Sequence, residues 1–245
     1  MHFAIFDIET RIDKALLKAI YYPDEPMSED EAYRKARQQT LEEQQGRSDF
    51  LPLSFHVPIS IAVGSVNEQR ILTSVEILGE ENSSEEGIVR AFWQRLEHFK
   101  GTLVSFNGRS FDLPVLELQA LKYGCQAPAY FNERYGHRYR YSEEKHYDLI
   151  EFLINFGTSR LRGGFNLVTR LIGFPGKTVI DGSKIQELWE SGKLDEIHTY
   201  CKHDVIQTYF LFLRIELIRG RITPEQYHEI LERSAPYLEM LNKET

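Results

Sequence analysis

Cysteine and long apolar runs are both scarce in this sequence, and each scarcity excludes a class of protein. The 245 residues include two cysteines, Cys125 and Cys201, which stand far apart. This usage predicts free thiols in a reducing compartment rather than a disulfide framework. No run of 18 apolar residues occurs, and the start lacks a basic, apolar leader, so we expect a soluble, cytoplasmic protein without a membrane span.

Positive charge is also in short supply. The formal net charge is -8, which argues against the broad basic surface that many nucleic-acid binders carry. A nucleic-acid enzyme stays compatible with this charge, because carboxylates that recruit divalent cations offset phosphate charge locally. The hydrophobic content of 42% is ample for a core, and we favour one α/β domain over residues 1–245.

The first ten residues place two acids in a buried strand pattern. Residues 3–8 form a short apolar run interrupted only by Asp7, and Glu9 follows two positions later. Alternate strand residues share a face, so these carboxylates would lie roughly 6.6 Å apart along the chain, which suits ligands of a two-metal site. The alternative, which we favour for an isolated Asp-x-Glu, is a strand that runs out into solvent.

Residues 11–52 predict a helical insertion over the sheet. They are dense in charge and glutamine, and Ser28 and Glu31 have the spacing of a capping box. A solvated surface helix without a function is the plainer interpretation. Further along, patterning predicts a strand hairpin over 55–66 and 69–75, and helices over 83–99, 166–172, 183–189, 194–219 and 224–241, the last packing within residues 223–245.

A second informative stretch is Gly101–Leu118, GTLVSFNGRSFDLPVLEL. It predicts a strand that Asn107-Gly108 ends, followed by a helix that begins near Phe111 and Asp112. Asp112 is then either a simple helix-start acid or a third metal-directed carboxylate. In the second case, Asn107 and the backbone beside it are available to touch a phosphate.

The irregular stretch Tyr130–Tyr141 holds three arginines and five aromatic residues. Arginine binds phosphate and aromatic faces stack on unpaired bases, so Arg134 and Arg138 are candidate substrate contacts. Ordinary loop packing explains the same composition equally well. The helix predicted to start at His146 carries Asp148 near its first turn, either as a cap or as a supporting group for the site.

A third informative stretch lies in the helix predicted over 194–219. Tyr200 and Asp204 are four residues apart and therefore point the same way from this helix. Seen alone, the pair is more often exposed on a solvated face than buried.

Together these three stretches resemble the DEDD superfamily of 3′-to-5′ exonucleases. Tyrosine four residues before the last acid resembles the DEDDy branch, whereas the sister branch has histidine five residues before it, where this chain has Thr199. The chain further resembles stand-alone predicted exonucleases related to the exonuclease domain of family-B DNA polymerases. The resemblance runs from Phe3 to about Gly220 and includes FHVPISIAV, SFNGRSFDLPVL, HYDLIEFL, GFPGKTVIDGSKIQELWESGKLDEI and YCKHDVIQTYFLFLR.

This resemblance implies a ribonuclease H-like fold, a central mixed sheet flanked by helices. It implies that two Mg2+ or Mn2+ ions are held by four acids, with Asp7 shared between them and Tyr200 orienting the attacking water. Glu9 and Asp204 would serve the water-activating ion and Asp112 the other. The substrate contacts that we expect are Thr10, Asn107, Gly108, Phe111, Arg134 and Arg138.

The implied reaction is removal of nucleoside 5′-monophosphates from single-stranded or frayed 3′ ends of DNA. The same carboxylates would serve an exoribonuclease equally well, since the 2′-hydroxyl is sensed elsewhere. A different class, a catalytically silent nucleic-acid-binding protein on the same fold, also stays open because a fold alone does not give activity. Nucleic acid is the expected partner in every case.

Overall fold

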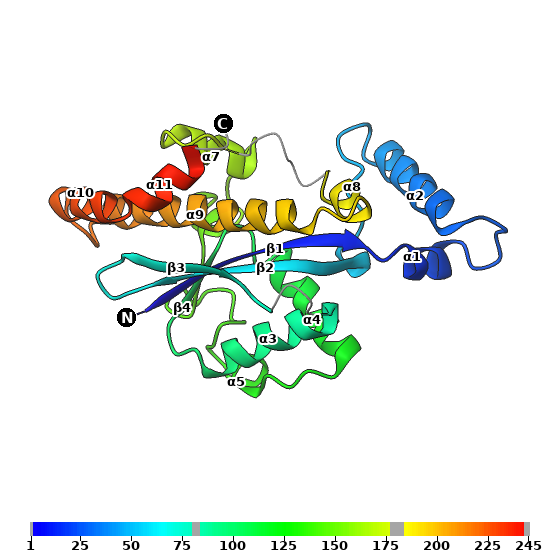
Figure 1. Cartoon of the computed structure of the whole chain (residues 1–245), viewed down its shortest axis with the longest axis horizontal. Helices are drawn as coiled ribbons and strands as arrows, with labels where there is room; N and C mark the ends of the chain where they lie inside the picture. The colour runs from blue at the N-terminus through cyan, green and yellow to red at the C-terminus, as the bar shows by residue number, and fades with distance from the viewer. Residues whose placement is uncertain (1, 80–83, 177–183, 243–245) are drawn as a thin grey trace.

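A mixed five-stranded sheet forms the centre of the molecule, in a computed structural model that describes residues 2–79, 84–176 and 184–242 (Figure 1). The strand order is β3-β2-β1-β4-β5, so the first strand lies in the middle. β2 and β3 run antiparallel to their neighbours, and β4 and β5 run parallel to β1. The strands are β1 (Phe3–Ile12), β2 (His56–Val66), β3 (Leu72–Ile77), β4 (Thr102–Ser105) and β5 (His146–Asp148).

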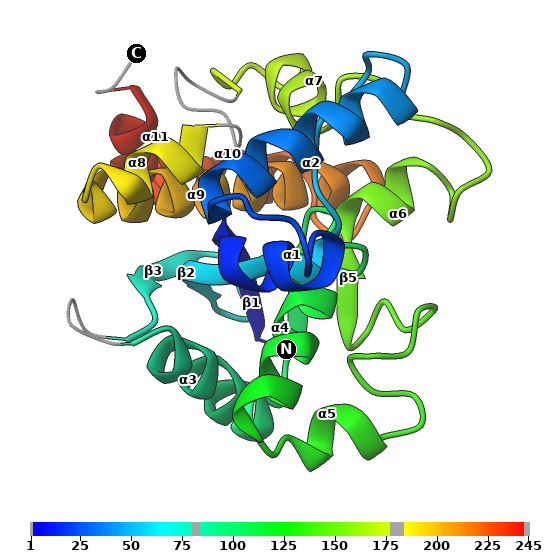
Figure 2. The same ribbon diagram turned by 90° about the vertical axis from the view of Figure 1, so that its right-hand side faces the viewer.

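Helices cover both faces of this sheet (Figures 1 and 2). On one face α3 (Glu85–His98), α4 (Asp112–Tyr123) and α5 (Pro128–Asn132) form one hydrophobic core with Phe6 and Ile8 of β1. On the other face α9 (Leu194–Ile218) packs on Phe3 and Ile5. The alternation of β1 residues between two cores confirms the expected α/β architecture of a mixed sheet between helices. The remaining helices on the α9 side are α6 (Leu149–Leu153), α7 (Gly164–Leu171), α8 (Ile185–Glu190), α10 (Pro224–Arg233) and α11 (Ala235–Asn242).

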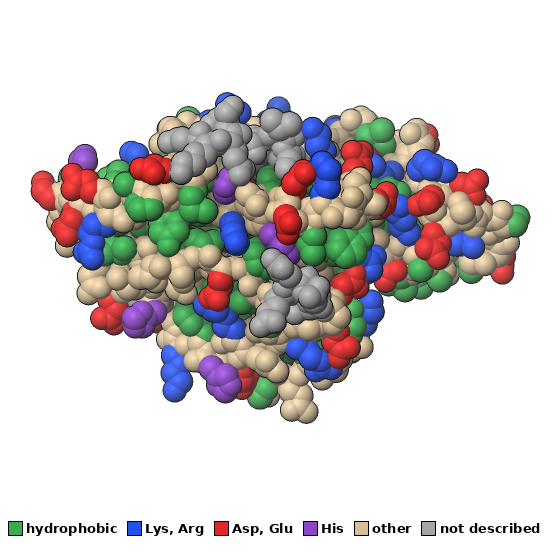
Figure 3. Space-filling model, viewed as in Figure 1, with side chains coloured by type: hydrophobic (Ala, Val, Ile, Leu, Met, Phe, Trp, Pro, Cys, Tyr) green, Lys and Arg blue, Asp and Glu red, His purple; other side chains and the backbone are tan. Residues whose placement is uncertain are grey.

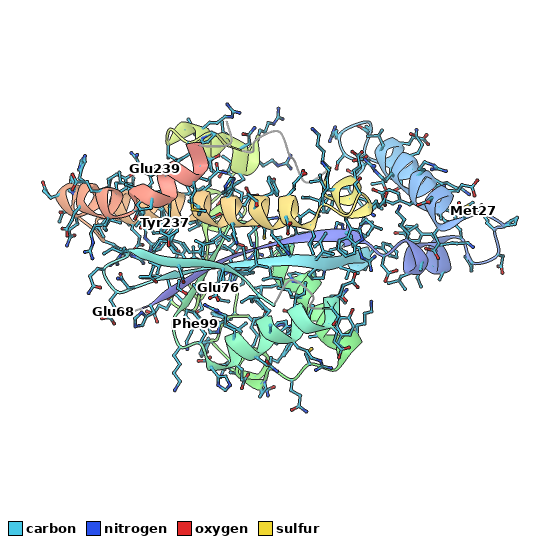
Figure 4. All side chains as sticks on the ribbon, viewed as in Figure 1. Met27, Glu68, Glu76, Phe99, Tyr237 and Glu239 are labelled. Atoms are coloured by element: carbon cyan, nitrogen blue, oxygen red, sulfur yellow. The ribbon has the colours of Figure 1, made fainter. Side chains whose placement is uncertain are left out.

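The segment between β1 and β2 forms two helices, α1 (Lys14–Tyr21) and α2 (Glu29–Glu43), with a small core of their own. Figure 4 shows Met27 of their connection at the opposite end of the molecule from Glu68 in the β2–β3 turn. The capping box is confirmed, because the Ser28 hydroxyl accepts from the Glu31 amide at 3.2 Å and the Glu31 carboxylate accepts from the Ser28 amide at 2.7 Å.

Several element boundaries differ from the sequence expectation. Arg11 and Ile12, expected in the insertion, still pair with β2 and extend β1. The second strand of the hairpin, expected over 69–75, begins later, at Leu72. The beginning of the stretch expected to be irregular, residues 130–132, belongs to α5, which starts at Pro128. The predicted helix start at Ser183, with Asp181-Gly182 before it, lies outside the described residues.

Two further differences arise from tertiary contacts. His146–Asp148, predicted as a helix start, is strand β5, because β4 offers its open edge and pairs with all three residues. The expected single helix over 224–241 is divided into α10 and α11 at Ser234. Ser234 is fully buried, and its hydroxyl lies 2.8 Å from the Tyr209 hydroxyl of α9, so this contact holds the interruption in place.

Gly64 of β2 lets α9 lie close to the sheet. A Cβ atom at this position would meet Val205 Cγ1 of α9 at 2.9 Å and Leu72 Cδ1 at 3.0 Å, closer than side-chain carbons approach. Val205 is β-branched and fully buried, so it has little freedom to move aside. Because Val205 follows Asp204, the depth of this packing also sets where that acid lies.

We expect Gly64→Ala to lower the free energy of unfolding by about 1–3 kcal/mol, since it overpacks the contact between β2 and α9. Val205→Ala removes the obstructing methyl group, so the double variant should lose less stability than the sum of the two single losses. Urea denaturation of the wild type, both single variants and the double variant measures this coupling. Strictly additive losses would contradict the proposed contact.

Candidate active site

Three carboxylates converge between the sheet and the long helix. Asp7 and Glu9 of β1 and Asp204 of α9 each offer one oxygen atom, and these atoms all lie within 4.8 Å of one another. Glu9 and Asp204 are buried, with 8% and 5% of their surface exposed, and Asp7 is partly buried. Hard oxygen ligands at this separation are the donor set that Mg2+ and Mn2+ prefer. The alternative of an Asp-x-Glu pair in open solvent is therefore wrong.

Strand alternation and core packing bring these acids together. Asp7 and Glu9 lie on the same side of β1 as Ile5, which packs in one cluster with Val205 of α9. Asp204 precedes Val205 and lies one helical turn after Tyr200. Burial of the α9 face therefore carries Asp204 to the two strand acids.

Tyr200 belongs to the same group of side chains. It is 4% exposed, so the expectation for an isolated Tyr/Asp pair, exposure on a solvated face, does not hold here. Burial first, and then the negative charges of Asp204, Glu9 and Asp7, raise the pKa of Tyr200 far above its usual range, and its hydroxyl is hydrogen-bonded to Asp204. The phenol therefore keeps its proton and can act as a hydrogen-bond donor.

Asp112, the fourth predicted acid, contacts the strand between the first two. It is 5% exposed, and its Oδ1 accepts a hydrogen bond from the Ile8 amide at 3.2 Å. This bond ties the first residue of α4 to β1, beyond the last pair between β1 and β4, Ile5↔Val104. Asp112 thus reaches the acidic strand segment, although the three oxygen atoms within 4.8 Å come from the other acids.

Asp148 holds the loop between β4 and α4. Its carboxylate accepts from the amides of Asn107 at 2.8 Å and Arg109 at 2.9 Å, and it also caps α6 by accepting from Ile150 at 3.3 Å. The expected cap is thus present, and the same carboxylate also fixes the loop that leads to Asp112. Burial raises the pKa of Asp148 to about 6, although the two backbone amides oppose this shift.

The same loop contains two positions with special backbone demands. Asn107 adopts a left-handed conformation with φ of 71°, which asparagine tolerates better than most residues. A Cβ atom on Gly108 would lie 2.4 Å from Ser105 Oγ, so only glycine fits there. These residues shape the loop that connects the end of β4 to Asp112.

Arg109, which sequence reasoning did not single out, connects this loop to the arginine-rich stretch. Its guanidinium donates to the carbonyl oxygens of His146 at 2.6 Å and His137 at 3.2 Å. It also forms an ion pair with Glu151 of α6 at 3.4 Å. A lone arginine in NGRSFD offers no sequence signal for these contacts, because its partners are mostly backbone atoms.

Thr10 contacts a second residue that the sequence did not reveal, His56. The Thr10 hydroxyl lies 2.7 Å from His56 Nδ1, and His56 Nε2 lies 3.2 Å from the Leu51 carbonyl oxygen. Burial lowers the pKa of His56 to about 4, so the ring is neutral. A carbonyl oxygen only accepts, so Nε2 carries the proton and Nδ1 accepts from Thr10.

The two predicted loop arginines each contact another residue of the protein. Arg138 forms two hydrogen bonds of 3.1 Å with Glu117 of α4. Arg134 lies over the ring of Tyr135, 5.2 Å from its centroid. Arg138 also lines a pocket of about 250 Å³ together with Arg109.

Cys201 is a further neighbour that the sequence analysis left without a role. Its Sγ lies 3.4 Å from the Asp7 carbonyl oxygen, and the residue is fully buried. Burial first, and then the charges of Asp7 and Glu9, raise its pKa well above the usual thiol range, so the sulfur stays protonated. Both cysteines are free, as expected.

Comparison with known proteins agrees with this geometry. A family model described as "Predicted 3'-5' exonuclease related to the exonuclease domain of PolB" matches residues 48–245. The chain belongs to this family. The match begins after β1, so it does not include Asp7 and Glu9, whose assignment depends on the sequence pattern and on the structure. No curated protein matches the chain.

Solved structures show the same fold. The family B DNA polymerase from the hyperthermophilic archaeon Pyrobaculum calidifontis is similar to this exonuclease-family chain with a TM-score of 0.56 and 15% sequence identity. The similarity covers 88% of the chain and 24% of the polymerase, so the chain spans about a quarter of that protein. The ribonuclease H-like fold is confirmed. Within the described ranges, no helix has the length and apolarity needed to cross a membrane.

Asp148 makes the stability of this family member depend on pH. The folded chain keeps the Asp148 proton up to about pH 6, whereas an ordinary aspartate releases it near pH 3.8. The folded state therefore binds more protons between these values, and this contribution to stability falls as pH rises through that window.

We expect the difference in unfolding free energy between the wild type and Asp148→Asn to change by roughly 2 kcal/mol between pH 4 and pH 6, in the sense that the wild type loses stability relative to the variant. Urea denaturation of both proteins at pH 4, 5, 6 and 7 measures it. Asp195→Asn, which alters an exposed acid of α9, should show no such trend. A constant difference for Asp148→Asn would show that burial does not control this carboxyl.

Proposed function

We propose that this chain is a single-domain, metal-dependent 3′-to-5′ exonuclease that releases nucleoside 5′-monophosphates from single-stranded or frayed 3′ ends of DNA. The observation that supports this most is the convergence of Asp7, Glu9 and Asp204 within 4.8 Å, with Tyr200 buried beside them. The family is one of predicted exonucleases, and its relation to polymerase proofreading domains favours a nucleic-acid 3′ end as the substrate.

The donor set fits a pair of divalent cations. All its members are carboxylates, and neither cysteine sulfur nor histidine nitrogen belongs to the three-residue group, so Mg2+ or Mn2+ suits it better than zinc. In this proposal Asp7, Glu9 and Asp204 hold the first ion, and Asp7 and Asp112 hold the second. When bound, two such ions activate water for in-line attack at phosphorus and stabilise the leaving 3′ oxygen.

The protein side chains provide orientation. Tyr200 keeps its proton because burial and the surrounding acids raise its pKa, so its hydroxyl can position the attacking water by a hydrogen bond. Asn107, Gly108 and Phe111 lie on the loop that Asp148 anchors, and the proposal gives them, with Thr10, the task of holding the last nucleotide. Alignment matters because a shift of about 1 Å at the reacting atoms can cost about 10²-fold in rate.

Asp7→Ala should abolish stepwise shortening of a 5′-labelled single-stranded oligonucleotide in Mg2+ or Mn2+, because it removes the acid shared between both ions. Gel electrophoresis of timed samples measures the shortening. The matched control is Asp195→Ala, which removes an exposed carboxylate from α9 and should leave the rate within about twofold, since exposed substitutions perturb little. Activity retained by Asp7→Ala would contradict the assignment of this acid.

The same assay also separates the competing substrates. DNA and RNA strands, each with a free and a blocked 3′ end, should show cleavage of the free DNA end in preference to the other three. Equal cleavage of RNA would correct the substrate to both nucleic acids. Binding of the strands without any shortening would replace the enzyme by a silent binding protein.

Tyr200→Phe should lower kcat by about 10²-fold while the affinity for Mn2+ stays unchanged, because the variant loses one oriented hydroxyl and no carboxylate. Single-turnover kinetics and a Mn2+ titration measure the two effects. Tyr237→Phe of α11, far along the chain from the acids, serves as the control. A collapse of metal affinity in Tyr200→Phe would show that the hydroxyl supports the carboxylates rather than the water.

A further inference from the structure

An exposed aromatic ring stands at the end of a stack beside the acidic site. Phe50 is 58% exposed, and its ring stacks on His56 with centroids 4.9 Å apart and an interplanar angle of 27°. Phe111 contacts both rings edge-on, at 5.5 Å from Phe50 and 5.1 Å from His56. A phenylalanine ring this exposed presents open apolar surface to solvent.

The stack is joined to the acidic site at two points. Phe111 directly precedes Asp112, whose carboxylate accepts from the Ile8 amide between Asp7 and Glu9. His56 accepts from the hydroxyl of Thr10, the residue that follows Glu9. The aromatic stack is therefore connected to Asp112 through Phe111 and to Glu9 through Thr10.

The ring that supports Phe50 is held firmly. Three contacts fix His56: Thr10 on Nδ1, the Leu51 carbonyl on Nε2, and the Gln119 amide, which donates to the His56 carbonyl oxygen at 3.1 Å. Its ring is neutral, so it carries no charge that would attract water into the stack. The exposed face of Phe50 is thus supported by a rigid neighbour, which reduces the entropy lost when another ring packs against it.

We infer that Phe50 is a stacking platform for an unpaired base near the 3′ end of single-stranded nucleic acid, an inference that rests on the proposed function. Base stacking on an aromatic face tolerates any sequence and contributes substantially to single-strand binding. It also suits an acidic protein. The net charge is -8, and acidic and basic side chains are interspersed on the face in Figure 3, so a general electrostatic attraction to the strand is weak.

The platform gives the site a means of selecting frayed ends. A base inside a duplex is already stacked on both neighbours, whereas an unpaired base has a free face to offer to Phe50. Phe50 belongs to the segment that joins α2 to β2. The helical insertion would therefore contribute directly to binding of the nucleic-acid strand.

The test asks whether the effect of substituting Phe50 depends on the presence of one particular base. Dissociation constants are measured by fluorescence anisotropy in an Asp204→Asn background, so that the strand is not consumed. The probes are a labelled single-stranded DNA and the same strand with an abasic site at the last, second-last or third-last position. Phe50→Ala, Phe50→Leu and Phe50→Trp are compared with Ile218→Ala, which changes another exposed apolar side chain, the last residue of α9.

We expect Phe50→Ala and Phe50→Leu to weaken binding of the intact strand by roughly five- to 100-fold, the range for loss of one stacked base, and Phe50→Trp to retain it. One abasic position should weaken wild-type binding by a similar factor, and Phe50→Ala should add no further loss on that strand. Ile218→Ala should bind as the wild type does. Thermal unfolding verifies that each variant is folded. Because Phe50 is exposed, its substitution should change stability little.

Two results would overturn the inference: unchanged binding by Phe50→Ala, or an equal loss on every abasic strand, which would indicate a site for another partner such as an apolar protein segment. Hydrolysis by the otherwise wild-type protein is followed separately. If the protein hydrolyses strands but the effect of Phe50→Ala does not depend on any one base, the stacking inference is wrong and the proposed exonuclease activity stands. If the effect of Phe50→Ala depends on one base but no strand is hydrolysed, the stacking inference stands and the proposed exonuclease activity is wrong. A wild type that neither binds nor hydrolyses strands removes both.

Discussion

Mutual repulsion among three carboxylates, two of them buried and Asp7 partly buried, is the constraint on which the site depends. Oxygen atoms within 4.8 Å of one another cost on the order of 3 kcal/mol per ionised pair, at an effective dielectric constant of about 20. The fold withstands this cost because β1 and α9 are packed into the core on either side of the acids. The close approach at Gly64 sets the depth of α9 and therefore the position of Asp204. A pair of divalent cations would convert this repulsion into binding free energy.

The loop between β4 and α4 is positioned by groups that take no part in the proposed chemistry. Asp148 accepts hydrogen bonds from two backbone amides of this loop. Arg109 joins the loop to the carbonyl oxygens of His137 and of His146, the first residue of β5. The loop leads directly to Asp112 and Phe111. A short β4 makes this arrangement possible, because its pairing with β1 ends at Ile5 and leaves the acidic half of β1 beside the loop. Rigid support of this kind is what a site aligned for displacement at phosphorus requires.

Local patterns in the sequence identify most of the fold and the acids themselves. Alternation in β1, the capping box at Ser28 and helical periodicity in α9 are all short-range features, so they can be identified without knowledge of tertiary contacts. Strand β5 and the interruption at Ser234 could not be predicted this way. Each depends on a partner far away in the chain, the open edge of β4 in one case and the Tyr209 hydroxyl in the other.

The residues of the site can thus be identified from the sequence. The period of a strand places two acids on one face, and the period of a helix places the tyrosine and aspartate of Tyr-x-x-x-Asp on one face. Their convergence within 4.8 Å is a property of the tertiary structure, because it depends on how closely α9 packs on β2. The same holds for Arg109, His56 and Phe50. These residues act through backbone carbonyls and ring faces contributed by distant segments, and no local spacing encodes such contacts.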